Sequence, residues 1–225
     1  MSKPLVIIGN SEIARMACEY FTHDSDRKIA AFAAEKSYVG SGSFLDRLVV
    51  DYDTITDRYP PSEFDAFVAI GSSQLNRLRA RFVTVTKAKG YTLASYVSSR
   101  AFVWHDVAIG ENAFILENNV LQSGVAIGND VTLWSGNHIG HQTSIADHVF
   151  VASHVVISGQ CSIGAFSFMG VNAAVAENVK VNEDNFVAMG AAVTRSTEPD
   201  QVLIGNPAEP HKVTAKRFCR VKVSA

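Results

Sequence analysis

The chain has no long apolar run and no surplus of basic residues, and each absence excludes a class of protein. Nowhere do eighteen apolar residues follow one another, so no transmembrane helix is predicted, and the first ten residues hold no apolar stretch typical of a signal peptide. Twenty Lys and Arg stand against 22 Asp and Glu, which gives a formal net charge of −2. We therefore expect a protein that neither enters a membrane nor binds nucleic acid.

Cysteine is also scarce. The three cysteines, Cys18, Cys161 and Cys219, are odd in number, lie far apart in the sequence and form no Cys-x-x-Cys motif. We expect reduced thiols and a cytoplasmic protein. The 225 residues are 47% hydrophobic and 19% charged, which suffices for one large domain or two small ones with a buried core.

The second half of the chain contains a six-residue repeat. An aliphatic residue returns at every sixth position, with a small or β-branched residue two places before most of them and a glycine often following. The series comprises Val97, Val103, Ile109, Ile115, Leu121, Ile127, Leu133, Ile139, Ile145, Val151, Ile157, Ile163, Met169, Val175, Val181, Val187 and Val193. The period fits short strands that turn a corner after each repeat, three to a coil. We expect all seventeen aliphatic residues inside a prism, and glycine or asparagine at corners that need a positive φ.

The part before the repeat has a different pattern. Short apolar segments predict strands over residues 4–9, 28–32 and 66–70, and helical periodicity predicts helices over 11–21 and 75–89. This alternation indicates a small parallel α/β domain over residues 1–95, followed by a repeat domain over 96–225. From Thr197 onward the chain leaves the six-residue phase and contains the segment 205–208 (GNPA) and then several basic residues.

The repeat has the form Leu/Ile/Val-Gly-x4, and in this it resembles the hexapeptide repeat of left-handed parallel β-helix acyltransferases. The order of a small Rossmann-like α/β domain, an uninterrupted repeat and a GNPA tail extends the resemblance to bacterial sugar acyltransferases of the NeuD and PglD type. The resemblance implies a left-handed parallel β-helix and a homotrimer. It also implies an N-acetyltransferase that uses acetyl-CoA and acts on a nucleotide-linked amino deoxysugar in surface polysaccharide or glycoprotein synthesis.

Acyl transfer to an amine or alcohol requires a base for the acceptor's proton, and imidazole suits this role near neutral pH. Four of the seven histidines fall within residues 137–154. His141 matches the family's catalytic histidine by register, which implies that it is the general base. Gln142 stands where the family often has a glutamate, and an amide there can orient the ring by a hydrogen bond. Asp147 or Glu117, from another coil or subunit, or no partner at all, remain alternatives.

The other three histidines of this stretch have different expected roles. His138 is expected to be a corner or packing residue, with a position facing the same cleft as His141 as the alternative, and His148 is expected to be solvated. His154 lies close enough on stacked strands to approach the site or a neighbouring subunit. Four neighbouring histidines also suggest a zinc site. No acidic or thiolate residue stands at metal-ligand spacing, so we expect no bound metal.

The resemblance also implies where the two substrates bind. The family lays the pantetheine arm between coils of adjacent subunits beside small residues, and the matching positions here are His154, Gly159, Gly170, Val171, Ala188 and Gly190. Gly205 and the basic tail are candidates for contacts with the adenine and its 3′-phosphate. The family binds its nucleotide at the carboxyl edge of the first domain's sheet, where Ser11, Glu12, Ile13, Gly71 and Ser73 are the candidates here. Ser11 is also expected to cap the helix that it precedes.

Two other functions are compatible with the same repeat. A sugar O-acetyltransferase of the sialic acid type would use the same base on a hydroxyl group. A non-catalytic β-helix scaffold or a zinc enzyme similar to carbonic anhydrase is the remoter alternative. The zinc enzyme needs three histidine ligands across a subunit boundary and leaves the α/β domain without a role.

Overall fold

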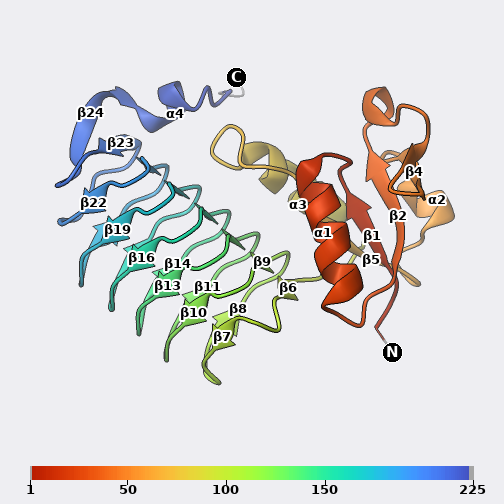
Figure 1. Cartoon of the computed structure of the whole chain (residues 1–225). Coiled ribbons are helices and arrows are strands. Elements are labelled where there is room, and N and C mark those ends of the chain that lie inside the picture. Colours follow the sequence, from red (N-terminus) through yellow and green to blue (C-terminus); the bar gives the residue numbers. More distant parts are fainter. Residues whose placement is uncertain (1, 223–225) are drawn as a thin grey trace. The chain divides into compact units, whose positions relative to one another are not determined.

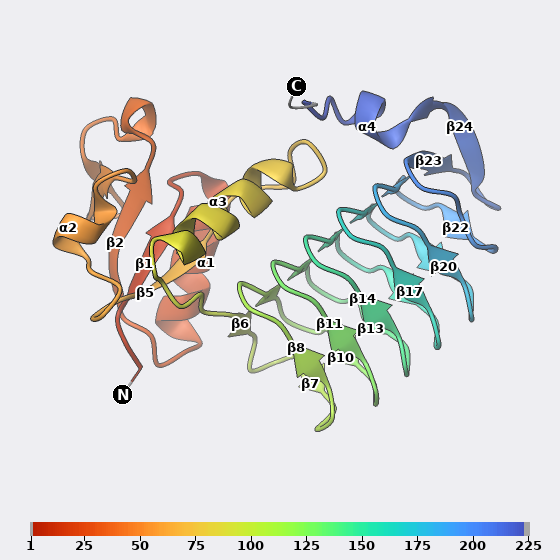
Figure 2. The same ribbon diagram turned by 180° about the vertical axis from the view of Figure 1, so that it is seen from behind.

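The computed structural model describes residues 2–222, which form two compact units. The first unit comprises Met1–Gly71 and Leu78–Tyr96, and the second comprises Ser72–Arg77 and Val97–Ala225. The short segment Ser72–Arg77 thus interrupts the first unit in sequence and belongs to the second. Figures 1 and 2 show the ribbon from opposite sides.

The first unit contains a five-stranded sheet in the order β3-β4-β2-β1-β5. Strands β1, β2, β4 and β5 pair in parallel, and β3 forms an antiparallel hairpin with β4. All four residues of β1 are buried, as expected of a parallel strand with helices on both faces of the sheet. The elements are β1 (Leu5–Ile8), α1 (Glu12–His23), β2 (Ile29–Ala34), η1 (Lys36–Tyr38), β3 (Ser43–Phe44), β4 (Arg47–Asp51), α2 (Ile55–Arg58), β5 (Asp65–Val68) and α3 (Arg77–Ala88).

The sequence pattern predicted three of these strands and two of the helices. The predicted strands correspond to β1, β2 and β5, and the predicted helices to α1 and α3, with ends shifted by two residues at most. Strands β3 and β4 and helix α2 were missed. Only one of the five residues of β4 is fully buried, so this strand lacks the apolar run that marks a central strand in sequence.

The second unit is a parallel β-helix with a regular register. In the coils up to β22, each strand residue pairs with the residue eighteen positions further on, as Leu121 does with Ile139 and Ile139 with Ile157. At the C-terminal end the register changes, because Phe186 pairs with Val202 sixteen positions further on and the last two strands pair antiparallel. The strands stack into three sheets, which we name after residues of one coil: the His138 sheet, the Ser144 sheet and the Phe150 sheet. Three strands and three corners therefore make each coil, as the repeat predicted.

The strands of each sheet follow one another along the β-helix (Figures 1 and 2). The His138 sheet contains β7 (Phe102–Val103), β10 (Val120–Leu121), β13 (His138–Ile139), β16 (Val156–Ile157), β19 (Ala174–Val175) and β22 (Ala192–Val193). The Ser144 sheet contains β8 (Ala108–Ile109), β11 (Ala126–Ile127), β14 (Ser144–Ile145), β17 (Ser162–Ile163) and β20 (Lys180–Val181). The Phe150 sheet contains β6 (Tyr96–Val97), β9 (Phe114–Ile115), β12 (Thr132–Leu133), β15 (Phe150–Val151), β18 (Phe168–Met169), β21 (Phe186–Val187), β23 (Gln201–Ile204) and β24 (Glu209–Thr214). Helix α4 (Ala215–Phe218) follows β24.

The interior of the β-helix is filled by the periodic aliphatic residues. Fourteen of the seventeen are buried, from Ile115 to Val193. The prediction of complete burial is wrong for Val97, Val103 and Ile109, which are only partly buried. Within the β-helix the first coil has a neighbouring coil on one side only, so less of its interior is covered.

Several polar side chains also lie inside the β-helix. They occupy the position two residues before an aliphatic residue, where most coils have Ala or Val, and comprise Asn119, Asn137, Thr143, Ser167 and Asn185. The Asn119 amide donates to Trp134 O at 2.8 Å, and Asn137 Oδ1 accepts from Val155 N at 2.8 Å. These side chains satisfy backbone groups at the corners that the short strands leave unpaired.

The glycine that follows an interior aliphatic residue permits close packing of coils rather than a positive φ. A Cβ added at Gly164 would lie 2.3 Å from Glu183 N, and one at Gly140 would lie 2.5 Å from Gly159 N. The positive φ values occur at the second residue of each corner, where Asn, Asp, His and Gln are most frequent. The expectation of glycine or asparagine with a positive φ holds at the corners themselves, where Gly124, Gly136 and Gly190 have φ values of 72°, 79° and 70°, but it does not extend to the glycines that follow the aliphatic residues.

We predict that Gly164→Ala destabilises the β-helix, because its Cβ meets the backbone of the next coil, which cannot move away. The free energy of unfolding should fall by about 1–3 kcal/mol, the usual cost of overpacking. Thermal and chemical denaturation would measure this. Ser144→Ala, on the exposed face of β14, is the control and should change stability little; equal stability of Gly164→Ala and the wild type would contradict the packing argument.

Candidate active site

The turns between sheets align into three corners along the β-helix. The His141 corner holds residues 105–106, 123–124, 141–142, 159–160 and 177–178; the His148 corner holds 111–112, 129–130, 147–148, 165–166 and 183–184; the His154 corner holds 117–118, 135–136, 153–154, 171–172 and 189–190. The strands of the His138 sheet run from the His154 corner to the His141 corner. These two corners therefore border the same sheet.

His141 is an exposed residue whose ring lies over Gly159 of the next coil. A Cβ added at Gly159 would lie 2.2 Å from Cε1 and 2.6 Å from Nδ1 of the ring. The His141 backbone N–H donates to Gln122 Oε1 at 2.9 Å. Among residues 2–222, no group forms a hydrogen bond with the His141 ring. The imidazole is therefore accessible and can exchange a proton with a bound ligand.

Gln142 is the second residue of the same turn and adopts a positive φ of 54°. Its N–H donates to Ser123 O at 2.9 Å, and its Cγ would lie 3.2 Å from a Cβ added at Gly124. The left-handed backbone thus directs the Gln142 side chain toward Gly124 of the preceding coil. Within the part of the chain that the structure describes, the amide makes no hydrogen bond with the ring of His141.

The two acidic residues considered as partners of His141 belong to other corners. Asp147 Oδ1 accepts from Asn129 N at 2.7 Å at the His148 corner. Glu117 Oε1 accepts from the Ser135 hydroxyl at 2.7 Å at the His154 corner. At the His141 corner itself, the N–H of Gly124 and the hydroxyl of Ser123 lower the pKa of the Asp106 carboxyl. Asp106 lies two coils before His141.

The residues predicted to contact acetyl-CoA lie mostly at the His154 corner. His154, Val171 and Gly190 are corner residues, and Gly170 and Ala188 follow strands β18 and β21 directly before it. Gly159 instead lies beneath the His141 ring. Gly205 follows β23, and its carbonyl accepts from Ala192 N at 3.0 Å.

The His154 corner also contains an apolar residue that the sequence analysis did not select. Met189 is 75% exposed and neighbours Gly190, and Val171 one coil earlier is 38% exposed. An apolar side chain at a corner position, where polar residues prevail, was the signal that could have identified Met189. Together these two side chains give the corner an exposed apolar surface.

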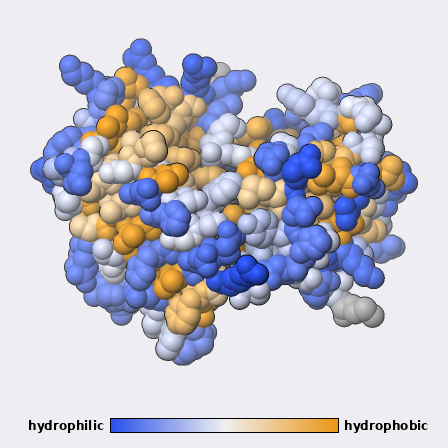
Figure 3. All heavy atoms as spheres, in the orientation of Figure 1, coloured by the Kyte–Doolittle hydropathy of each residue, from blue (hydrophilic) through white to orange (hydrophobic). Residues whose placement is uncertain are grey.

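The outer face of the His138 sheet is largely apolar. Its strands present Val120, His138, Val156, Ala174 and Ala192 outward, and Val156 is 46% exposed. Figure 3 shows apolar side chains gathered on the β-helix in the orientation of Figure 1. The accessible imidazole and most of the predicted acetyl-CoA residues thus border one apolar sheet face.

The environment of His148 differs from the solvated one expected from the sequence. Its Nδ1 lies 2.9 Å from Oδ2 of the buried Asp130, and its ring stacks on Phe166 with centroids 4.7 Å apart. Its carbonyl accepts from the Asn76 amide at 2.7 Å. His148 is therefore part of the packing of its corner.

Three of the predicted acceptor-binding residues lie together in the first unit. Ser11 and Ile13 are at the start of α1, after β1, and a Cβ added at Gly71, after β5, would lie 3.9 Å from Ile13 Cγ1. This is the carboxyl edge of two adjacent parallel strands, where ligands of α/β folds bind.

Ser11 is the N-cap residue of α1, but its side chain makes no capping hydrogen bond, so that expectation was wrong. Its exposed hydroxyl remains available to a ligand. Glu12 is exposed and pairs with Arg15 at 3.4 Å. Ser73 is exposed and lies in the segment Ser72–Arg77 of the second unit.

A pocket of about 180 Å³ lies in the first unit near the carboxyl ends of β2 and β4. Its lining comprises Glu35, Tyr52, Asp53, Arg81, Phe82 and Val85. Arg81 pairs with Glu35 at 3.0 Å. No sequence pattern marks this pocket, because β4, which brings Tyr52 and Asp53 beside the end of β2, has no apolar run.

Two further observations concern metals and membranes. Within residues 2–222, no group of three or more His, Cys, Asp or Glu side chains has an arrangement that would hold a metal ion. No helix in the same range combines the length and the apolar character needed to span a bilayer.

Comparisons with known proteins match both the repeat and the fold. Residues 124–159 match the family model described as bacterial transferase hexapeptide (six repeats). No curated protein sequence matches the chain significantly. A variant of perosamine N-acetyltransferase from Caulobacter crescentus, solved with CoA and GDP-perosamine, is 22% identical and superposes with a TM-score of 0.85, covering 94% of this chain and 98% of that chain.

Two further solved structures are similar over nearly their whole length. The acetyltransferase domain of PglB from Neisseria gonorrhoeae is 20% identical, with a TM-score of 0.83 over 93% of this chain and 100% of that one. WeeI from Acinetobacter baumannii is 19% identical, with a TM-score of 0.66 and the same coverage. The predicted fold, a small α/β domain followed by a left-handed parallel β-helix of hexapeptide repeats, is thereby confirmed.

We predict that Gly159→Ala displaces the ring of His141 while leaving the coils intact. The three atoms nearest the added Cβ all belong to the exposed His141 side chain, which can rotate away. The imidazole resonances of His141 should shift in proton–carbon correlation spectra, whereas those of His138 and His154 should not. Unchanged His141 resonances in a folded variant would contradict the stacking of the ring on Gly159.

Proposed function

We propose that this chain, which carries bacterial transferase hexapeptide repeats on the fold of solved sugar N-acetyltransferases, is an N-acetyltransferase that uses acetyl-CoA and a nucleotide-linked amino deoxysugar. The similarity includes the α/β unit as well as the β-helix, since it covers 94% of this chain. The perosamine N-acetyltransferase was solved with CoA and GDP-perosamine, and the PglB domain with acetyl coenzyme A. The observation that carries the proposal is the accessible His141 ring at the border of the apolar His138 sheet.

In this proposal His141 is the general base. The amine nitrogen of the sugar attacks the thioester carbonyl, and His141 accepts the proton that this nitrogen loses. The new C–N bond forms, the C–S bond breaks, and the sulfur leaves as the thiolate of CoA, which takes up a proton. The transfer is direct and requires no acetylated enzyme. The absence of a hydrogen bond to the His141 ring within residues 2–222 supports the role, because a lone pair on the ring is then available.

The pantetheine arm is proposed to lie along the outer face of the His138 sheet. One side of the arm would be bordered by residues at or next to the His154 corner, namely His154, Gly170, Val171, Ala188 and Gly190. The other side would be bordered by His141 and Gly159. The apolar character of this face supports the proposal, since the arm carries aliphatic carbons between its amides. Gly205 and the exposed cations of Lys212 and Arg217 are the proposed contacts for the adenosine part.

The enzyme is further proposed to act as a cytoplasmic homotrimer in polysaccharide or glycoprotein synthesis. Within one chain, Glu117 and Asp147 stand at other corners than His141, so either carboxylate would reach this ring from a neighbouring subunit. Gln142 would then not contact the ring, and its left-handed backbone would instead help to shape the His141 corner. The three cysteines are free thiols, which supports a reducing compartment.

The direct test is an assay of CoA release from acetyl-CoA with a panel of UDP-, dTDP- and GDP-linked amino sugars. We expect acetylation of one member, with a product that resists hydroxylamine because it is an amide. A product cleaved by hydroxylamine would indicate an ester and hence O-transfer. No acetyl transfer to any member of the panel would overturn the proposed function.

We predict that His141→Ala and His141→Asn lower kcat by about 10²–10⁴ without unfolding the protein, the usual contribution of general base catalysis. Gln142→Ala should cost much less. The matched control is His105→Ala, because His105 occupies the equivalent position of the same corner two coils earlier. A His141→Ala enzyme with the kcat of the wild type would assign the base to another residue or to the substrate.

We predict that Val171→Asp raises KM for acetyl-CoA by about tenfold or more, because it places a charge where the apolar arm would lie. KM for the amino sugar should change little. Val171 suits this test better than Gly170, because a Cβ at Gly170 would lie 2.5 Å from Met189 N and disturb the coils. Leu48→Asp, at an exposed apolar residue of β4, is the control. An unchanged KM for acetyl-CoA would move the proposed groove elsewhere.

A further inference from the structure

The segment Ser72–Arg77 has an unusual backbone. Gln74, Leu75 and Asn76 have φ values of 56°, 49° and 63°, so three consecutive residues other than glycine are in the left-handed region. Such residues normally occur singly, because Cβ crowds the following carbonyl. A strained run of this kind persists only where its surroundings hold it, and strain of this kind gathers at ligand clamps and active sites.

Two buried side chains of the run anchor it to the β-helix. Leu75 is 1% exposed and packs with Val202 and Ala215, next to Phe168 and Phe186 of the Phe150 sheet. Asn76 is fully buried, and its amide donates to His148 O at 2.7 Å. The strained residues are thus held by side chains that would be exposed if the run relaxed.

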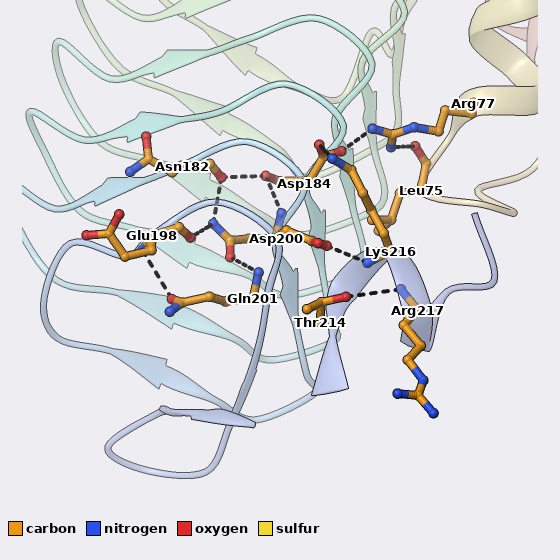
Figure 4. Close-up of polar contacts among 12 residues, drawn as sticks. Leu75, Arg77, Asn182, Asp184, Glu198, Asp200, Gln201, Thr214, Lys216 and Arg217 are labelled. Atoms are coloured by element: carbon orange, nitrogen blue, oxygen red, sulfur yellow. Dashed lines mark hydrogen bonds and ion pairs between the residues drawn. The ribbon is translucent and has the colours of Figure 1, made fainter. Parts of the chain in front are cut away.

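Arg77 fixes the end of the segment. Its guanidinium lies over the ring of Phe166, 4.3 Å from the centroid, and pairs with the carboxylate of Asp184. The same carboxylate accepts from Lys216 Nζ of α4 at 2.8 Å. Figure 4 shows the side chains of Arg77 and Lys216 both pointing toward Asp184. The side chains of Asp184 and Arg77 are 8% and 25% exposed, so their ion pair is largely shielded from water, whereas the Lys216 side chain is 42% exposed.

The surface beneath Arg77 is a continuous column of side chains that contact one another. Phe166 stacks on His148, His148 Nδ1 pairs with Asp130 Oδ2 at 2.9 Å, and Asp130 Oδ1 accepts from the Asn112 amide at 2.8 Å. Each member is the second residue of its turn at the His148 corner, eighteen positions from the next. The segment therefore rests on a column of side chains that stacking and hydrogen bonds join from one coil to the next.

We propose that Ser72–Arg77 is a clasp that holds Ser73 in position for the acceptor sugar nucleotide, with Arg77 and Asp184 as positioning residues. The inference rests on the proposed function. Ser73 is exposed, follows Gly71 by two residues and directly precedes the strained run. The backbone conformation of the clasp therefore determines where the Ser73 hydroxyl lies. Neither Arg77 nor Asp184 needs to touch a substrate for this effect.

The test compares Arg77→Met with the wild type, because methionine keeps apolar contact with Phe166 and removes only the ion pair. The acceptor is the sugar nucleotide of the UDP, dTDP and GDP panel that the wild type acetylates fastest. We expect KM for this acceptor to rise about tenfold or more, with kcat and KM for acetyl-CoA within about threefold of the wild type. Asp184→Asn should act in the same way, and Asp184→Glu should restore part of the acceptor affinity.

The control is Arg81→Met, which removes an exposed ion pair with Glu35 on the same helix α3 and should leave the hydrogen exchange of the clasp unchanged. A second readout needs no activity. Amide hydrogen exchange of residues 74–77 should accelerate about tenfold or more in Arg77→Met, while the amides of coil 102–119, two coils before His148, keep their wild-type rates.

The outcomes separate the two proposals. Unchanged exchange in residues 74–77 would overturn the clasp itself. Faster exchange with an unchanged acceptor KM would show a merely structural clasp and overturn its positioning role. A wild-type protein that acetylates no member of the panel would overturn the proposed function and, with it, the acceptor role of Ser73, while the exchange data would still decide whether the clasp exists.

Discussion

The register of eighteen residues per coil is the constraint on which the second unit depends. Because Leu121, Ile139 and Ile157 lie one above the other, every residue type that recurs with this period forms a column. The interior columns bury the aliphatic side chains, and glycine after them lets the coils approach. The same alignment sets the exposed columns, so that the ring of His141 meets Gly159 and Phe166 meets His148. The chemistry of the corners is thus a consequence of the packing of the core.

Most of the β-helix was predictable from the sequence because its contacts repeat within a short period. The elements that escaped prediction depend on residues far apart. The Asn76 amide bonds His148 O across 72 positions, and Arg77 meets Asp184 across 107. No local pattern marks such pairs, so neither the membership of Ser72–Arg77 in the second unit nor the partial burial of His148 could be derived. The strand β4 was missed for a different reason, since its side chains are mostly half-exposed and leave no apolar run.

The candidate site was predicted in part for the same reasons. The accessibility of His141 follows from its corner position, which the period determines. A bond from Gln142 to that ring was a reasonable expectation for adjacent residues, but the left-handed φ of Gln142 turns its side chain toward Gly124. The predicted acetyl-CoA residues divide between two corners, which the period alone does not reveal as neighbours. The structure shows that these residues lie along the two edges of one sheet, because both corners border the His138 sheet.

A crystal structure of the protein with CoA and an amino sugar nucleotide would test the central claim most directly. The account predicts that the pantetheine arm lies on the outer face of the His138 sheet, between the His154 and His141 corners. It also predicts that a ring nitrogen of His141 lies about 3 Å from the sugar amine, or reaches it through one water molecule. CoA bound on another sheet, or an amine beyond the reach of His141, would contradict the account.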